Sequence, residues 1–299
     1  MKYIKFNDFT KEKNLWINQI THWYNKNKRD LLWRKPENQN FYSIWISEIM
    51  LQQTNVQTVE KYFVAFKKKW PTLKSFLNAN LNEILKMWQG LGYYQRAKNI
   101  YKTLQILKKK KINITYNELI KLPGIGEYSA ASISAILKDH NHTVVDCNIK
   151  RIFSRVFDLD SNAKGFNTQV YKRAKEYTPN SGNGDYCQAL MDIGATICKP
   201  RQVNCNICPL TKFCDFFITQ KKILKKKSVS KKKKIGIVFI YQFKNEIYIE
   251  KSEEIFLHGL MKFQTSDFLE YTSKYEYTKK KKLLDMKNNF VSKNSNFGF

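Results

Sequence analysis

Apolar residues recur at intervals of three and four through most of the chain, from about residue 15 to residue 217. Because this spacing gathers apolar side chains on one face of a helix, it predicts a series of amphipathic helices. Three apolar stripes are assigned to the core: Val59, Tyr62, Phe63 and Phe66; Leu81, Ile84, Leu85 and Trp88; and Tyr94, Ala97, Tyr101, Leu104 and Leu107. Gly90 follows the second stripe and is expected to end its helix.

The pattern changes after residue 220. Residues 221–234 are rich in lysine and serine and nearly free of large apolar side chains, which predicts a charged linker. Residues 235–243 and 247–251 read as two strands joined by a short polar turn, which predicts a β-hairpin. We therefore predict a mainly α-helical domain over residues 1–220, the linker, and a small α+β domain over residues 235–299.

Composition adds a preference for a polyanionic partner. The 299 residues carry a formal net charge of +28, which favours nucleic acid. Lysine supplies most of the 53 basic residues, so a compositional bias of the source also explains part of this charge without any binding role. The first residues lack the apolar segment of a signal peptide, and no stretch approaches a membrane span. We expect a cytoplasmic protein without membrane contact, in which thiols stay reduced.

Four of the six cysteines fall within a short segment, in the order Cys198-x6-Cys205-x2-Cys208-x5-Cys214. In a reducing compartment such a group predicts a metal centre rather than disulfides. Four thiolates at short spacing can hold an iron–sulfur cluster, and four-cysteine zinc sites use a similar Cys-x2-Cys element. The spacing alone leaves both metals open.

The segment Leu122–Gly126, with the sequence LPGIG, lies between two predicted helices. Gly124 and Gly126 allow a tight turn and a close approach of the backbone to a ligand. Open N–H groups at the start of the following helix favour an anion, which in a basic protein would be a DNA phosphate. The plain alternative is a simple connection between helices.

Two carboxylates are candidates for chemistry. Glu48 lies on a predicted helix among large apolar residues, where burial would raise its pKa and let it hold a proton at neutral pH. The alternative is an exposed glutamate on the helix surface. Asp146 precedes a predicted helix and could serve as its N-cap, with or without a further role.

The motifs together resemble those of the adenine DNA glycosylase family of the MutY type, within the helix-hairpin-helix (endonuclease III) superfamily. The resemblance covers about residues 29–217 and rests on Ile44–Thr54, Gly90–Tyr94, Leu122–Gly126, Val145–Arg151 and the cysteine run. It implies a mainly α helix-hairpin-helix glycosylase with a [4Fe–4S] cluster held by Cys198, Cys205, Cys208 and Cys214. It also implies a small, shortened, Nudix-like α+β domain at the C-terminus.

The resemblance assigns catalytic roles to individual residues. Glu48 is implied to be the general acid that protonates the departing adenine, and Asp146 the anion that stabilises the positively charged sugar. Asn148 is implied to support these groups by hydrogen bonding. Tyr128 occupies the position of a Schiff-base lysine in related bifunctional glycosylases, so we expect base hydrolysis without strand scission.

Further residues match positions that contact DNA in the family. Gln53 and Tyr93 match wedge positions that fill the gap left by an extruded base, although Tyr93 could equally be a core residue. Gln188 matches a position that faces the extruded adenine. The residues assigned to DNA or base binding are Arg34, Gln53, Tyr93, Gln188, Gly124 and Gly126.

The sequence also departs from the family pattern. Leu32 stands where proline is usual, and Cys147 where glycine is usual, so the loop after Asp146 is expected to be less permissive. Glu127 places a negative charge beside the phosphate-binding turn and should weaken that contact. Towards the C-terminus, residues 256–263 resemble a degenerate lesion-domain loop and residues 289–293 a weak trace of the lesion-reading loop, in a domain that ends earlier than expected.

We therefore predict an enzyme that removes adenine opposite 8-oxoguanine or guanine from double-stranded DNA. We expect it to act as a monomer in a bacterial cytoplasm, in association with the nucleoid. One alternative is a bifunctional glycosylase and lyase that resembles endonuclease III. The other is a DNA-binding relative without catalytic activity.

Overall fold

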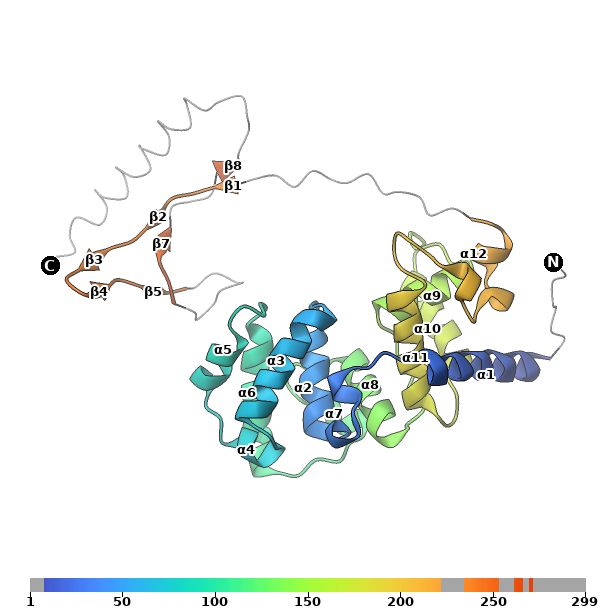
Figure 1. Ribbon diagram of the computed structural model, residues 1–299, viewed down its shortest axis with the longest axis horizontal. Helices are drawn as coiled ribbons and strands as arrows, with labels where there is room; N and C mark the ends of the chain where they lie inside the picture. Colours follow the sequence, from blue (N-terminus) through green and yellow to red (C-terminus); the bar gives the residue numbers. More distant parts are fainter. Residues whose placement is uncertain (1–7, 222–233, 253–260, 266–268, 271–299) are drawn as a thin grey trace. The chain divides into compact units, whose positions relative to one another are not determined.

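The computed structural model describes residues 8–221, 234–252, 261–265 and 269–270. The chain divides into two units, Met1–Lys225 and Lys226–Phe299. The helices of the described residues lie in the first unit and the named strands in the second (Figure 1). Residues 222–233, which are all but the two ends of the predicted linker 221–234, lie outside the described residues, as do residues 256–260 and 289–293. No helix in the described ranges is long and apolar enough to span a membrane.

The first unit contains a series of helices, and three of them carry the apolar stripes named above. The helices are α1 (Phe9–Asn27), α2 (Phe41–Leu51), α3 (Val56–Lys69), α4 (Leu73–Leu77), α5 (Leu81–Trp88), α6 (Gln95–Lys109), α7 (Tyr116–Leu119), α8 (Glu127–Lys138), α9 (Cys147–Val156), α10 (Phe166–Tyr177), α11 (Asn183–Thr196) and α12 (Asp215–Ile218). Several of these helices have a polar N-cap residue. Its side chain accepts a hydrogen bond from a backbone N–H group of the first turn that would otherwise lack a partner, and this stabilises the turn. These N-caps include Asp8, Asn40, Asn55, Thr72, Asn80, Thr115 and Asp146.

The first core lies between α2, α3, α5, α6 and one face of α8. In α3, Val59, Phe63 and Phe66 are buried as the stripe predicts, whereas Tyr62 is only partly buried. Helix α5 ends at Trp88 and is followed by Gly90 with a φ of 90°, a left-handed conformation that favours glycine. The predicted helix end at Gly90 is therefore confirmed.

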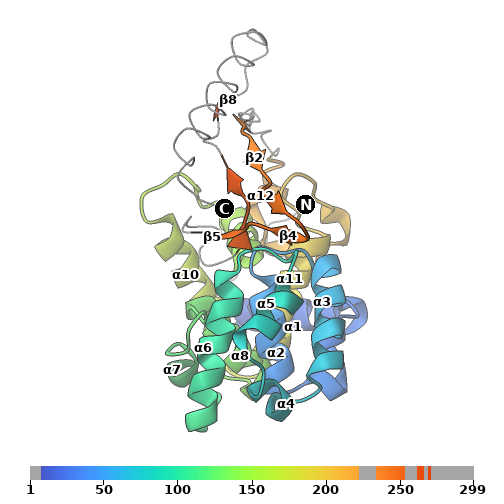
Figure 2. The ribbon, with the colours of Figure 1, turned by 90° about the vertical axis from the view of Figure 1, so that its left-hand side faces the viewer.

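The second core joins α1 to α9, α10 and α11. Trp16 is fully buried in it, and its indole nitrogen donates a 2.9 Å hydrogen bond to the Tyr186 hydroxyl. Helix α8 contributes to both cores, with Ile133 in the first and Ala135 in the second. The two groups of helices thus share α8 as a common element (Figure 1). Figure 2 shows α2, α3, α5 and α6 of the first group together.

The second unit contains four short antiparallel pairings. They are β1 (Lys234–Ile235) with β8 (Leu269–Glu270), β2 (Val238–Phe239) with β7 (Gln264–Thr265), β3 (Gln242–Phe243) with β4 (Glu246–Ile247), and β5 (Glu250–Lys251) with β6 (Met261–Lys262). The predicted hairpin is present at β3–β4, where Phe243 pairs with Glu246. Its turn therefore has two residues rather than the expected three, and Lys244 adopts a φ of 50°. The earlier part of the predicted strand pairs with β7 instead.

Candidate active site

Glu48 lies on α2, a helix whose residues from Tyr42 to Met50 are buried. Its own exposed fraction is only 7%. Its Oε2 atom has no hydrogen-bond partner among the described residues, and neither has the nearby Ser132 hydroxyl on α8. Since a buried polar atom without a partner is costly, this pair is suited to receive a polar ligand.

Burial raises the pKa of Glu48 to about 7. The hydroxyls of Tyr128 and Ser132 and the charge of Arg34 act in the opposite direction, while the negative charge of Asp146 raises the pKa further. A carboxyl group with such a pKa is partly protonated at neutral pH and can donate a proton. The burial expected from the sequence is therefore observed.

Asp146 is the N-cap of α9. Its negative charge also acts on the nearby carboxyl group of Glu48. Its Oδ1 atom accepts a 2.6 Å hydrogen bond from the backbone N–H of Ile149, and its Oδ2 atom accepts one of 2.8 Å from the side-chain amide of Asn148. Burial raises the pKa of Asp146, and these hydrogen bonds counteract the rise. Because both oxygens act as acceptors, the arrangement favours the ionised carboxylate.

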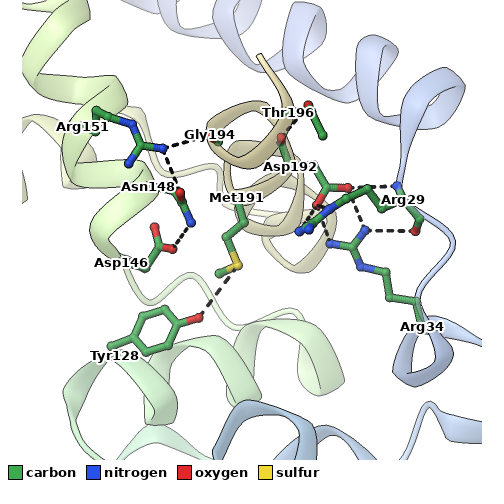
Figure 3. A network of polar contacts seen from close by, with 10 residues as sticks. All are labelled: Arg29, Arg34, Tyr128, Asp146, Asn148, Arg151, Met191, Asp192, Gly194 and Thr196. Atoms are coloured by element: carbon green, nitrogen blue, oxygen red, sulfur yellow. Dashed lines mark hydrogen bonds and ion pairs between the residues drawn. The ribbon is translucent and has the colours of Figure 1, made fainter. Parts of the chain in front are cut away.

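Arg151 links this carboxylate to the cysteine segment through hydrogen bonds to Asn148 and Cys198. Its contacts with Asn148 and Gly194 are drawn in Figure 3. One of its terminal nitrogens donates to the side-chain oxygen of Asn148 and to the carbonyl of Gly194, both at 2.8 Å. Its Nε donates to the carbonyl of Cys198, also at 2.8 Å. A Cβ added at Gly194 would lie 2.5 Å from the Cβ of Asn148, so glycine is needed for this close approach.

Tyr128 lies on the first turn of α8, and its hydroxyl donates to the sulfur of Met191 on α11 at 3.8 Å (Figure 3). Burial raises its pKa well above the usual value, and the charges of Glu48 and Asp146 add to the rise. The phenol therefore stays neutral near both carboxylates. Gln188 is half-buried on α11, where its side-chain amide donates to the carbonyl of Gly184 at 3.2 Å.

Asp192 is fully buried on α11 and binds two arginines, which sequence reasoning missed. Arg34 donates to its two carboxylate oxygens at 2.7 and 3.0 Å, and Arg29 donates to it at 2.7 Å through Nε (Figure 3). Although burial alone would raise the pKa of Asp192, the hydrogen bonds and charge of Arg34 lower it. Both terminal nitrogens of Arg34 bind Asp192, and the assignment of Arg34 to DNA binding stays a prediction.

The four cysteines of the predicted metal centre are free thiols on the loop after α11, and all are partly buried. Burial raises the pKa of Cys208 to about 12 and that of Cys214 to about 11, and the other thiols of the group raise both further. Arg155 donates to the sulfur of Cys198 at 3.1 Å. Within the described ranges, no three cysteine, histidine or acidic side chains come close enough together to hold a metal ion. The donor set itself, four sulfur atoms without disulfides, suits a soft metal or an iron–sulfur cluster.

The hairpin lies between α7 and α8. Gly124 has a φ of 82°, whereas Gly126 has a φ of −88° and needs no left-handed conformation. Gly126 is the N-cap of α8 and leaves its first turn without a side-chain cap, so the N-terminal N–H groups can receive an anion.

Gln53 and Tyr93 both have positive φ, 58° and 47°, and both are exposed. With 54% of its surface exposed, Tyr93 is not a core residue.

Two of the departures from the family pattern, at Cys147 and Leu32, are accommodated locally. Cys147 is the first residue of α9, is exposed, and does not adopt a positive φ, so its backbone does not require glycine. Leu32 opens a short 3-10 helix, Leu32–Arg34, and packs against the first core. The expected restriction of the loop after Asp146 is therefore not seen in its backbone.

Comparison with known proteins gives the class of this site. Residues 46–179 match the family described as HhH-GPD superfamily base excision DNA repair protein. A solved thermostable thymine-DNA glycosylase aligns with a TM-score of 0.63 at 26% identity, over 71% of this chain and 100% of that one. A trapped endonuclease III–DNA covalent intermediate aligns with a TM-score of 0.59 over 72% of this chain and 99% of that one, and at 19% identity it shows a shared fold. The predicted mainly α helix-hairpin-helix fold is thus confirmed, and the class is that of base-excision repair glycosylases.

Relatives narrow the class further. The adenine DNA glycosylase of Buchnera aphidicola subsp. Schizaphis graminum is 38% identical over 246 residues, which are 79% of this chain and 70% of that protein. The adenine DNA glycosylase of Homo sapiens is 34% identical over 206 residues, which are 64% of this chain and 37% of that protein. The chain belongs to the adenine DNA glycosylase family, and it is a hydrolase that acts on N-glycosyl bonds.

Proposed function

We propose that this protein hydrolyses the N-glycosidic bond of adenine mispaired with 8-oxoguanine or guanine in double-stranded DNA, without cutting the strand. The observation that carries the proposal is the buried carboxyl of Glu48, with a pKa of about 7 and one oxygen without a partner among the described residues. Its position near Asp146 supports a site with one carboxyl that donates a proton and one that stays charged.

In the proposed reaction, the bond between C1′ of the sugar and N9 of adenine breaks, and its electron pair leaves with the base. Glu48 donates a proton to N7 of adenine, so that the base departs as a neutral molecule. Asp146 stabilises the positive charge that develops on the sugar, while Asn148 holds the carboxylate in place. Water then adds to C1′ and gives a proton to the Glu48 carboxylate, which leaves an abasic site and restores the acid.

The absence of strand cutting is proposed from Tyr128. A lyase needs an amine that forms an imine with the sugar aldehyde, and a phenol cannot form one. Tyr128 lies beside Glu48 and Asp146, where such an amine would be required. Borohydride should therefore trap little protein on DNA, and the product should be cut only after alkali. Efficient trapping would support a bifunctional enzyme instead.

Duplex DNA is proposed to bind across the hairpin and the two exposed turns. The uncapped N-terminus of α8 would receive a phosphate, helped by the net charge of +28. Gln53 and Tyr93 would enter the space left by the extruded adenine, as their exposure and positive φ values support. Gln188 would face the extruded base.

We also propose a [4Fe–4S] cluster held by Cys198, Cys205, Cys208 and Cys214. Burial disfavours the charged thiolate form of these cysteines. Bound iron would be held by the thiolates, so it would offset this free-energy cost. The cluster would order its own loop. Because Arg151 contacts the carbonyl of Cys198, the loop would also support the chain of hydrogen bonds that ends at Asp146. Brown protein with broad visible absorption is expected, and one zinc ion without iron after anaerobic purification would contradict the cluster.

Recognition of 8-oxoguanine is proposed to lie in the second unit, and catalysis in the first. A protein ending at Lys225, the boundary between the units, should still release adenine opposite guanine. It should lose much of its preference for adenine opposite 8-oxoguanine. Equal preference in the full-length and shortened proteins would contradict a lesion-reading role. We propose further that the protein acts as a monomer in the bacterial cytoplasm, associated with the nucleoid.

The decisive experiment measures base release in single turnovers from duplexes that carry adenine opposite 8-oxoguanine, guanine or thymine. Release opposite 8-oxoguanine and guanine, with little opposite thymine, is the expected result. Glu48→Gln keeps the shape of the side chain but cannot donate the proton, so it should bind these duplexes and release no adenine. A normal rate in this variant would remove Glu48 from the mechanism.

A further inference from the structure

Arg96, on the first turn of α6, carries a buried positive charge without an ion pair among the described residues. Only 7% of its surface is exposed, and no described carboxylate lies within ion-pair distance. Burying an unpaired charge is costly unless its hydrogen-bonding capacity is used. The partners of the guanidinium therefore indicate what the residue does.

One terminal nitrogen of Arg96 binds the C-terminal end of α2. It donates to the carbonyl oxygens of Ile49 at 3.1 Å and Met50 at 2.9 Å, and also to that of Gln52. Carbonyl groups at the end of a helix lack partners and carry partial negative charge, which a cation satisfies. The same nitrogen contacts the hydroxyl of Thr54 at 3.2 Å. Arg96 therefore binds the residue before Gln53 and the residue after it.

The second terminal nitrogen binds the turn after α5. It donates to the carbonyl oxygens of Leu91 at 3.0 Å and Gly92 at 3.1 Å, immediately before Tyr93. It also contacts the hydroxyl of Thr54 at 3.2 Å. The guanidinium carbon lies 5.5 Å from the centre of the Tyr93 ring, within the range of a cation–π contact.

The two turns that Arg96 joins have strained conformations. Gln53 and Tyr93 have φ values of 58° and 47°, which residues other than glycine adopt rarely and only where the surroundings hold them. A single guanidinium supplies several donors in a planar fork, so it can satisfy carbonyl groups from two segments at once. A lysine ammonium is a compact charge at the end of a flexible chain and cannot bridge both turns in the same way.

We propose that Arg96 is a positioning residue for base extrusion, which holds the turn of Gln53 and the turn of Tyr93 in one fixed arrangement. The inference rests on the proposed function, because it takes these two side chains as the residues that replace the extruded base. Arg96 does not touch the DNA in this proposal. It fixes the separation of the two wedge residues, so that both enter the duplex together.

The test separates base extrusion from bond cleavage. The rates of base release by Arg96→Lys and Arg96→Met are compared with that of the unchanged protein on two substrates. One duplex carries adenine opposite guanine, and the other carries adenine opposite an abasic site. Extrusion costs least where the base already lacks a partner, so the second substrate depends less on the wedge. We expect release from the paired substrate to fall about tenfold or more, and release from the unpaired substrate to change by less than about threefold.

Extrusion is also read directly, without chemistry. A 2-aminopurine placed opposite guanine becomes more fluorescent when it leaves the stack, and Glu48→Gln as the background prevents base release. Adding either Arg96 substitution to this background should remove most of the fluorescence rise at saturating protein. Tyr42→Phe is the matched control, since it removes a buried 2.8 Å hydrogen bond to the Trp70 carbonyl from the same group of helices without touching either turn.

The outcomes decide between a positioning role and a general structural role. A loss on the paired substrate alone, with the fluorescence change abolished and Tyr42→Phe normal, supports the proposal. Equal losses on both substrates, or an unchanged fluorescence rise, overturn it. If the unchanged protein releases adenine from neither duplex, the proposed function fails, whereas the 2-aminopurine signal still tests the role of Arg96.

Discussion

The side-chain amide of Asn148 donates a 2.8 Å hydrogen bond to Oδ2 of Asp146 while its oxygen accepts one of equal length from Arg151. Asn148 can make both contacts only in one orientation of its amide group. Arg151 thus selects the orientation that presents a donor to the carboxylate, although its own hydrogen bonds go to Cys147, Asn148, Gly194 and Cys198. Hydrogen bonds in such a chain strengthen one another.

This relationship predicts the effect of removing Arg151. Arg151→Leu should lower the single-turnover rate of base release by about tenfold or more, because Asn148 loses the contact that orients it. DNA binding should change much less. Arg173→Leu is the control, since Arg173 is an exposed arginine whose hydrogen bond goes to Glu176 on the same helix. Equal rates in both variants would show that Asn148 keeps its orientation without Arg151.

Gly194 provides a second test of the same contact. A Cβ at this position would lie 2.5 Å from the Cβ of Asn148, and both residues belong to closely packed helices. Gly194→Ala should therefore destabilise the fold by about 1–3 kcal/mol, as overpacking does in buried positions. It should also slow base release by displacing Asn148. Thermal unfolding and single-turnover rates check the two effects, and normal values for both would mean that α9 and α11 can separate at little cost.

The pKa of Glu48 predicts the pH dependence of catalysis. Glu48 must be protonated to act as an acid, so the rate should fall as the pH rises through about 7. Asp146 must be ionised, and burial raises its pKa, so the rate should also fall towards acid pH. A bell-shaped profile of single-turnover rates is expected. A rate that is flat across neutral pH would contradict Glu48 as the proton donor.

The same group predicts a change of stability with pH. The folded protein holds the Glu48 proton with a pKa of about 7, above the ordinary value of 4.5. The bound proton stabilises the folded protein fully below the ordinary pKa, and this stabilisation is lost as the pH rises through the folded-state pKa. The loss in unfolding free energy is about 3 kcal/mol. Glu48→Gln lacks this titration. As the pH rises, the unfolding free energy of the unchanged protein should therefore fall relative to that of Glu48→Gln. The groups that face Glu48, namely Tyr128, Asp146, Arg34 and Cys187, are present in both proteins.

Helices such as α5 could be predicted because they bury one continuous face. Ile84 and Trp88 in α5 repeat at the helical period, and both are fully buried. For Glu48 the pattern left a buried and an exposed position both open, and the resemblance to the family decided in favour of a buried acid. The strand pairing in the second unit follows a different rule. The partner of Val238 is Thr265, and no local periodicity specifies such a distant pairing.

Residues whose partners lie far along the chain were the ones that the sequence could not assign. The contacts of Asp192 with Arg29 and Arg34 span 163 and 158 positions. A lone aspartate in the apolar stretch of α11 was a signal that some cation must reach it. Which cation does so depends on how the segment before α2 folds against α11. For the same reason, the sequence did not reveal the ion pair between Arg34 and Asp192.

Removing Asp192 should therefore cost more than removing a surface charge. Asp192→Asn would leave the guanidinium groups of Arg29 and Arg34 partly buried without their counter-ion, which is expected to cost about 3–5 kcal/mol. Chemical denaturation at neutral pH measures this loss. Lys35→Gln is the control, because its ion pair with Asp30 is exposed and should contribute little. A small loss for Asp192→Asn would show that the two arginines find other acceptors.

The two cores differ in how their residues are distributed along the chain. The first is built from a continuous stretch between Leu31 and Ile133, whereas the second needs Trp16 from α1 and residues that follow position 131. During synthesis α1 leaves the ribosome first, but Tyr186, the partner of Trp16, emerges 170 residues later. The apolar face of α1 therefore stays without its partner through most of translation, a state prone to aggregation. Because the residues of the first core precede α11 in the chain, we expect the helices around Glu48 to form before Asp146 acquires its surroundings, and both carboxylates to be in place only once α11 has docked.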